Sequence, residues 1–134
     1  MDNNLILKIL KLKSIAIVGL SNKHHKPSYQ IFTYLNRNGY ETIPVNPSYG
    51  IIDDKKCYPD LESINVPVDT VNIFRKSEYI LPIIQSAIKI NVKAIWMQDN
   101  VVNKEAFEAA KNAGLLVIMN DCILRRHQEI SIDL

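Results

Sequence analysis

The sequence SIAIVGLSNKHHKPS, residues 14–28, joins a short apolar run to a polar turn and then to the start of a helix. The run over 14–20 is rich in Ile and contains Gly19 near its end, a pattern typical of a buried strand. Pro27 suits the first position of a helix, and Gly39 suits the left-handed position that ends many helices. Between them, apolar residues share one helical face: Ile31, Phe32 and Leu35. The stretch therefore predicts a strand, a turn and a helix.

The same alternation of patterns continues along the chain. Further strands are predicted over 41–46, 69–74, 93–98 and 115–119. One helix is expected to begin a few residues after Ser77, with Pro82 in its first turn. Another is expected between a cap at Asn103 and an end at Gly114. Each predicted strand is thus joined to the next by a segment longer than the strand itself.

The remaining segments are less regular. Residues 47–67 are bounded and interrupted by prolines, so we expect a long excursion with one helical turn around 60–64. Pro44 is unusual for a central strand, because proline cannot donate to the ladder. We interpret residues 1–13 as a short amphipathic helix rather than a signal peptide. Residues 120–134 are expected to form a polar tail.

Strands that alternate with helices indicate an α/β fold. Right-handed crossovers then favour a doubly wound, mostly parallel, five-stranded sheet with helices on both faces. The 134 residues suit one domain. We divide it into the N-terminal helix (1–13), the α/β core (14–119) and the C-terminal tail (120–134). In such sheets ligands bind beyond the carboxyl ends of the strands, where the strand order reverses.

Composition excludes several classes of protein. The chain is 47% hydrophobic and 22% charged, which is ordinary for a globular domain. Its net charge of +2 argues against a broad nucleic-acid or membrane-surface binder. No apolar run is long enough to span a bilayer. Cys57 and Cys122 are far apart and form no CxxC motif, so we expect a reducing, cytoplasmic location without disulfides.

The turn after the first strand has the features of a phosphate site. Gly19 permits a tight turn, Ser21 offers a hydroxyl, and the helix that starts near Pro27 presents free N–H groups. Lys23 and Lys26 add positive charge to this turn; the alternative is an ordinary solvated loop. The dinucleotide motif G-x-G-x-x-G and the Walker motif are both missing, and no acidic residue closes the second strand. NAD binding and nucleotide hydrolysis are therefore disfavoured.

No catalytic or metal-binding constellation is evident. His24 and His25 are adjacent and point apart, and there is no G-x-S-x-G elbow. Arg75 follows a strand and could hold a phosphate or form a surface salt bridge. Cys122 could meet a ligand or be a small buried hydrophobe. We therefore predict no catalytic residue and no metal ligand in this chain.

Several short segments, in matching order along the chain, resemble the small bacterial CoA-binding-domain proteins. The fold of these proteins is shared with the CoA-binding domain of the succinyl-CoA synthetase α subunit. The matching segments are Ile15-Ala-Ile-Val-Gly-Leu-Ser21, Lys26-Pro-Ser28, Gly39-Tyr40, Ile43-Pro-Val-Asn-Pro47, Val68-Asp69, Phe74-Arg75, Trp96-Met-Gln98, Ala113-Gly114 and Met119-Asn-Asp-Cys122. They cover nearly the whole chain. The resemblance implies a Rossmann-like fold and a coenzyme A or acyl-CoA ligand.

The resemblance also implies which residues bind the ligand. The pyrophosphate would fall on Gly19, Ser21, Lys26 and Ser28. The adenosine ribose would lie near Val45, Asn46 and Pro47. Phe74 and Arg75 would line the cofactor, and Gln98, Asn120 and Cys122 would lie near the pantetheine arm. The family often has Arg where this chain has Lys26, which keeps the charge but loses the forked geometry.

Three functions follow as hypotheses. The first is a stand-alone CoA-binding protein without catalysis of its own, whose protein partner is unknown. The second is a CoA-binding subunit of an acyl-CoA-using enzyme, with catalytic residues supplied by a partner chain. The third is a regulatory module for another nucleotide such as NAD, which the missing glycines disfavour. Nucleic-acid and membrane partners are not expected.

Overall fold

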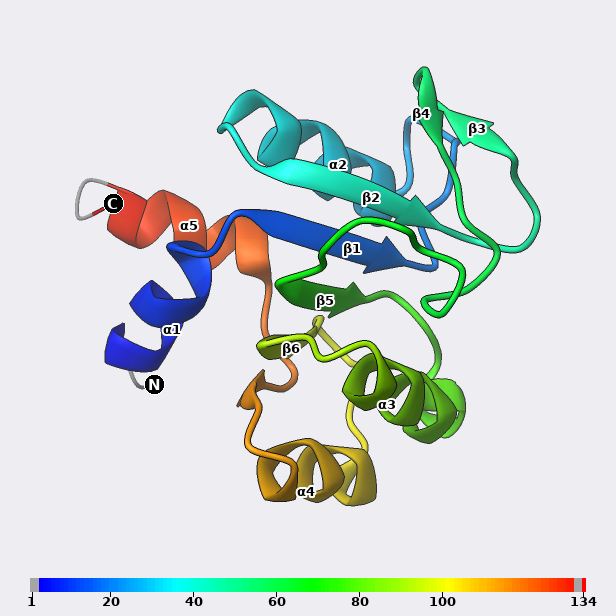
Figure 1. The fold of residues 1–134 in the computed structure, drawn as a ribbon. Coiled ribbons are helices and arrows are strands. Elements are labelled where there is room, and N and C mark those ends of the chain that lie inside the picture. The colour runs from blue at the N-terminus through cyan, green and yellow to red at the C-terminus, as the bar shows by residue number, and fades with distance from the viewer. Residues whose placement is uncertain (1–2, 132–133) are drawn as a thin grey trace.

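A computed structural model describes residues 3–131 and 134. Its centre is a parallel five-stranded sheet (Figure 1). The strands are β1 (Ser14–Val18), β2 (Glu41–Val45), β5 (Thr70–Ile73), β6 (Ala94–Met97) and β7 (Leu116–Ile118). The helices are α1 (Asn3–Leu10), α2 (Pro27–Arg37), α3 (Ile80–Lys89), α4 (Lys104–Asn112) and α5 (Ile123–Ile130). This confirms the predicted α/β, doubly wound, Rossmann-like class.

The strand order is β2-β1-β5-β6-β7. The chain moves outward from β1 to β2 and then crosses back to β5 on the other side of β1. The order therefore reverses between β1 and β5, and this is where such folds bind ligands. In Figure 1 the carboxyl ends of β1, β2 and β5 point to the right, away from both chain termini.

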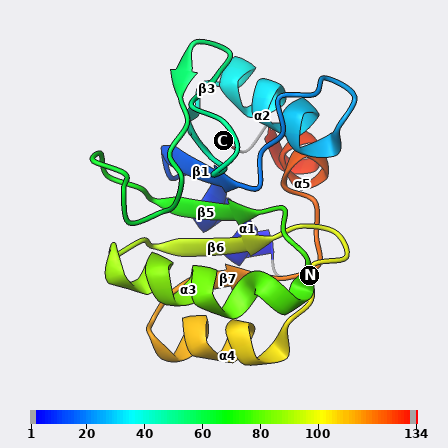
Figure 2. The ribbon, with the colours of Figure 1, turned by 90° about the vertical axis from the view of Figure 1, so that its right-hand side faces the viewer.

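Helices cover both faces of the sheet. The side chains of Ala16 and Val18 face α3 and α4, in a cluster that includes Ile84 and Ala106. The alternate residues of the strands face α1, α2 and α5, in a second cluster that includes Trp96. Figure 2 shows α3 and α4 on one side of the strands and α2 and α5 on the other. Because both faces are covered, the strands are nearly uniform apolar runs rather than alternating ones.

Local signals placed most of these elements correctly. The Asn103 side chain accepts a hydrogen bond from the Ala106 amide at 3.0 Å, which confirms the predicted cap of α4. Gly39 and Gly114 have φ values of +88° and +85° just beyond α2 and α4. Pro82 lies in the first turn of α3, which a short 3₁₀ helix, η1 (Ser77–Tyr79), precedes. Pro44 is accommodated because β2 is an edge strand.

The prediction for the segment after β7 was wrong. Instead of a polar tail, residues 123–130 form α5, which packs against α2. Ile123 and His127 are buried on its inner face, and the His127 ring nitrogen Nδ1 lies 2.6 Å from the Tyr34 hydroxyl. Burial lowers the pKa of His127. The helix was missed because this inner face is narrow and includes a histidine.

The excursion between β2 and β5 holds a small hairpin that was not predicted, β3 (Ile51–Ile52) with β4 (Lys55–Lys56). Its turn residues, Asp53 and Asp54, both have positive φ. The helical turn expected around 60–64 is a single hydrogen-bonded turn, closed by the Ile64 amide on the Leu61 carbonyl at 3.2 Å. Residues 59–61 of this segment lie at the carboxyl edge of the sheet, where they share a pocket with Val18 and Val45.

Candidate functional site at the carboxyl edge of the sheet

The turn between β1 and α2 is built around Gly19. Its φ is +85°, and its amide donates to the Val45 carbonyl at 2.9 Å. A Cβ at this position would lie 2.5 Å from the carbonyl oxygen of Phe74. Glycine is therefore required both by the backbone conformation and by the close approach of the chain after β5. This contact brings the β1 turn and the end of β5 together at the reversal point.

Internal hydrogen bonds shape the rest of the turn. The Ser21 amide donates to the Ser28 hydroxyl at 3.1 Å, and the Lys23 amide donates to the Ser21 hydroxyl at 3.1 Å. Ser28 is buried, so its hydroxyl supports the turn from within. Lys26 is the exposed N-cap residue of α2, and its side chain makes no capping bond. The first amides of α2 and the Lys26 ammonium therefore remain for an anion.

Residues 74 and 75 separate two pockets at this edge. We define the Pro59 pocket, about 220 Å³, by Val18, Gly19, Val45, Pro47, Pro59, Asp60, Leu61, Arg75, Pro82, Ile83 and Ser86. We define the Cys122 pocket, about 450 Å³, by Pro27, Ile31, Phe74, Arg75, Lys76, Gln98, Asp99, Asn100, Val101 and Cys122. Arg75 lines both pockets. One elongated ligand could thus occupy both of them across Arg75.

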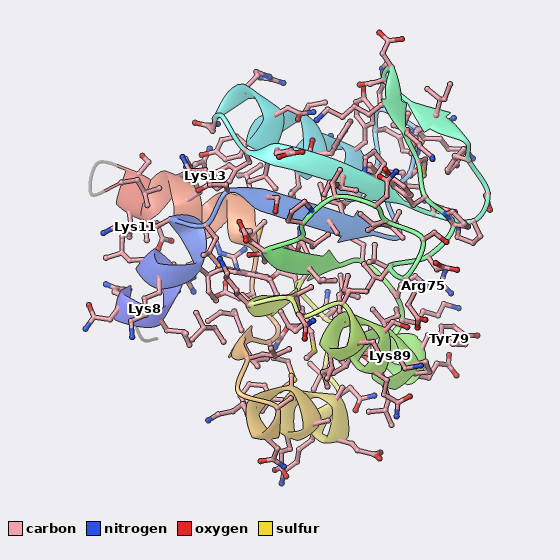
Figure 3. The ribbon with its side chains drawn as sticks, in the orientation of Figure 1. Lys8, Lys11, Lys13, Arg75, Tyr79 and Lys89 are labelled. Atoms are coloured by element: carbon pink, nitrogen blue, oxygen red, sulfur yellow. The ribbon has the colours of Figure 1, made fainter. Side chains whose placement is uncertain are left out.

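Arg75 is exposed and forms no salt bridge with any described residue. Its guanidinium carbon lies 5.2 Å from the ring centroid of Tyr79. Figure 3 shows both side chains at the edge beyond β5. Of the two alternatives from the sequence, the structure gives no support to the surface salt bridge. A guanidinium held against an aromatic ring keeps its forked donors for a ligand.

Predicted residues divide between the pockets and the framework. Val45 and Pro47 line the Pro59 pocket, whereas Gln98 and Cys122 line the other. Asn46 is engaged within the protein, because its side-chain amide donates to the Leu20 carbonyl at 3.0 Å and its oxygen accepts from the Ser48 amide at 2.9 Å. Asn46 therefore ties the first two loops together.

Asn120 also forms its side-chain hydrogen bond within the protein. It has a φ of +59°, and its side-chain oxygen accepts from the Asn100 amide at 2.8 Å. It joins the loops after β6 and β7 and lines neither pocket. Its contribution is to hold the loop carrying Asp99 against the start of α5.

Cys122 is the N-cap residue of α5 and is half-buried. Arg125, one turn along this helix, bonds the carboxylates of Asp99 and Asp121, and the Asp99 bond raises the pKa of Arg125. Cys57, in contrast, is buried, and burial raises the pKa of its thiol. Of the two thiols, Cys122 is therefore the one placed to meet a molecule in the pocket.

Sequence reasoning missed part of the pocket lining. Leu61 and Pro59 come from the excursion, and Pro82 and Ile83 come from α3. Prolines next to apolar residues were visible in the sequence, but nothing local showed that they return to the sheet edge. Val101, four residues after the end of β6, also lines the Cys122 pocket, and the strand-end rule did not reach that far.

Two features are absent from the described residues. Over residues 3–131 and 134, no group of His, Cys, Asp and Glu side chains is arranged to hold a metal ion. Within the same residues, no helix has the length and apolar character needed to cross a membrane. The arrangement that is present is the Gly19 turn at the start of α2, with Arg75 lining a pocket on each side of it.

The fold and this turn define a Rossmann-like domain of the kind that binds nucleotides at the strand reversal. The profile of the CoA-binding domain family matches residues 13–128, and the chain belongs to this family. This confirms the resemblance found in the sequence.

The chain is also similar to individual proteins. The chain is 36% identical over 115 residues to the "uncharacterized protein YneT" of Bacillus subtilis, covering 86% of this chain and 85% of that protein. It is 32% identical to a hypothetical protein from Pyrococcus horikoshii of known structure, with a TM-score of 0.94 and coverage of 98% and 93%. It is also 27% identical over 101 residues to an ADP-forming acetate–CoA ligase of Archaeoglobus fulgidus, spanning 74% of this chain but 15% of the ligase.

Proposed function

We propose that this chain binds coenzyme A or an acyl-CoA as a stand-alone module, without catalysis of its own. The observation that carries the proposal is the position of Arg75 between two pockets, next to the Gly19 turn and the start of α2. Coenzyme A has a matching division, with a nucleotide at one end, a pantetheine arm at the other and a pyrophosphate between them. Family membership supports the same ligand.

In this proposal each part of the ligand meets suitable chemistry. The pyrophosphate lies against the first amides of α2, Lys26 and Arg75. The adenosine end occupies the Pro59 pocket, whose walls include Val45 and Pro47. The pantetheine arm occupies the Cys122 pocket, whose apolar side chains include Phe74 and Ile31. Coenzyme A also carries a 3′-phosphate that NAD lacks, and the positive charges of Lys26 and Arg75 favour the more negative ligand.

Lys26→Ala and Arg75→Ala are each expected to weaken CoA binding by about tenfold or more, since charge-assisted phosphate contacts are strong. Both side chains are exposed, so the melting temperature without ligand should change little. Lys8→Ala is the matched control, because Lys8 is equally exposed but lies at the opposite end of the molecule (Figure 3). Calorimetric titration measures all three. Unchanged affinity in both site variants would place the phosphates elsewhere.

Cys122 provides a chemical test of where the pantetheine arm ends. When the protein is oxidised in the presence of CoA, the two thiols lose two electrons and two protons to the oxidant and form a mixed disulfide. We expect this adduct on Cys122 and not on the buried Cys57. Peptide mass spectrometry locates it, and Cys122→Ser should abolish it while retaining most reversible binding. An adduct mainly on Cys57 would contradict the placement of the arm.

A second candidate function is a CoA-binding subunit of a larger acyl-CoA-using enzyme. The similarity to part of an acetate–CoA ligase favours it. Against catalysis by this chain alone, the Cys122 thiol has no hydrogen bond to a histidine or a carboxylate within the described residues. Acyl-CoA hydrolysis by the pure protein that disappears in Cys122→Ser would overturn the non-catalytic proposal.

The bound ligand can be identified without choosing candidate compounds in advance. The protein is purified under native conditions and denatured, and the released small molecules are analysed by mass spectrometry. CoA or an acyl-CoA is the expected result. Release of NAD, or of an adenine nucleotide without pantetheine, would contradict the proposal.

A further inference from the structure

A buried pair of side-chain amides lies next to the Cys122 pocket. Asn72, in the middle of β5, is fully buried, and Gln98, directly after β6, is 3% exposed. The Gln98 amide nitrogen Nε2 donates to the Asn72 side-chain oxygen Oδ1 at 2.6 Å. Gln98 lines the Cys122 pocket, whereas Asn72 does not. Among the described residues, Asn72 is thus linked to the pocket lining by its hydrogen bond to Gln98.

The register of the sheet explains why these side chains meet. Asn72 lies opposite Trp96 on β6 and opposite Ile17 on β1. Because side chains alternate between faces, Gln98 projects from the same face as Trp96, two residues earlier. It is therefore a diagonal neighbour of Asn72, at the end of the strand where the ligand pocket begins.

The environment of Asn72 makes its presence costly. Its neighbours across the sheet are apolar, and its own side-chain nitrogen Nδ2 has no hydrogen-bond partner within the described residues. A buried donor without an acceptor destabilises a fold, and an aliphatic side chain at this position would avoid that cost. The fold therefore gives no reason for an asparagine here, whereas Gln98 does.

We infer that Asn72 is a positioning residue, which holds Gln98 so that its side-chain oxygen serves as a hydrogen-bond acceptor in the Cys122 pocket. One of the two N–H groups of Gln98 Nε2 donates to Asn72 Oδ1 and fixes the orientation of the amide, so the oxygen Oε1 is the acceptor that Gln98 holds in place. The inference rests on the proposed function, in which the amide-containing arm of CoA occupies this pocket. An amide N–H of that arm is the donor that Oε1 would accept from.

The experiment compares two ligands, CoA and adenosine 3′,5′-bisphosphate, which lacks the pantetheine arm. Asn72→Leu removes the acceptor at similar side-chain size. We expect it to weaken CoA binding by about fivefold to tenfold, the effect of one hydrogen bond, and to leave bisphosphate binding unchanged. Gln98→Leu should have the same selective effect. In the double variant, Asn72→Leu should add nothing further, because Gln98 is no longer there to be positioned.

Thr70→Val is the matched control. Thr70 is on the same strand and the same face, is fully buried, and has a hydroxyl without a partner among the described residues. It does not contact Gln98 through any hydrogen bond in this part of the chain, so both affinities should stay at the wild-type value. If Asn72→Leu does not fold, Asn72→Ala removes the same acceptor without adding volume and is measured on the same two ligands.

The outcomes separate this inference from the proposed function. Wild-type protein that binds neither ligand refutes the proposed function and the inference together. Wild-type protein that binds CoA normally, with an Asn72 variant that has wild-type CoA affinity, refutes the inference alone. An Asn72 variant that loses affinity for both ligands equally shows a purely structural role and also refutes it.

Discussion

Gly19→Ala is expected to lower the free energy of unfolding by about 2–4 kcal/mol and to reduce CoA binding more than any other single change at the site. The alanine Cβ would lie 2.5 Å from the Phe74 carbonyl oxygen, and the backbone φ of +85° is itself unfavourable for alanine. The clash is relieved only if the β1 turn moves away from Phe74 and Arg75, which separates the parts of the proposed phosphate site. Denaturant unfolding and calorimetric titration measure the two effects.

Gly114→Ala is the matched control for this prediction. Gly114 has the same φ of +85°, but a Cβ there would have no neighbour within 4 Å. Gly114→Ala therefore has the backbone strain without the clash. We expect it to lower the free energy of unfolding by about 1–2 kcal/mol and to leave CoA affinity unchanged. Equal losses of stability in the two variants, with binding retained in Gly19→Ala, would show that the contact with Phe74 is unimportant.

Asp121→Ala is expected to cost about 2–4 kcal/mol of stability, since charged hydrogen bonds to a buried carboxylate are lost together. Asp121 is 1% exposed, and its carboxylate accepts from the Cys122 amide, Arg125 and Arg126 at 2.8–2.9 Å. These bonds fix the start of α5 at the edge of the Cys122 pocket. Thermal unfolding measures the loss.

Asp99→Ala distinguishes this effect from the loss of a surface charge. Asp99 also bonds Arg125, but its side chain is 49% exposed, and exposed pairs contribute little. We expect Asp99→Ala to have nearly wild-type stability. A cost in Asp99→Ala as large as that in Asp121→Ala would mean that the surface pair, rather than the buried carboxylate, holds α5 in place.

The parts of the fold that could be predicted depend on local sequence. The strand at 14–18, the cap at Asn103 and the helix end at Gly39 each follow from residues within a few positions. The α5 helix could not be predicted in the same way. Its buried side chains, Ile123 and His127, are stabilised by packing against the other helices rather than by a strong local signal.

The candidate site was predictable in outline but not in its internal supports. Strand-end reasoning and the family resemblance selected Arg75, Gln98 and Cys122, and the structure places all three around one pocket. The sequence did not point to Asn72, because its partner Gln98 is 26 residues away and the two side chains meet through the register of the sheet. A buried asparagine in an apolar strand was the signal available.

In our proposal, the β1 turn, Arg75 and the two pockets together form a site for coenzyme A. Calorimetric titration of the full chain with CoA, NAD and ATP under one set of conditions tests it most directly. We expect one CoA bound per chain, with an affinity at least about tenfold higher than for NAD or ATP, because only CoA supplies both the third phosphate and the pantetheine arm. NAD or ATP binding as tightly as CoA, or no binding of CoA, would contradict it.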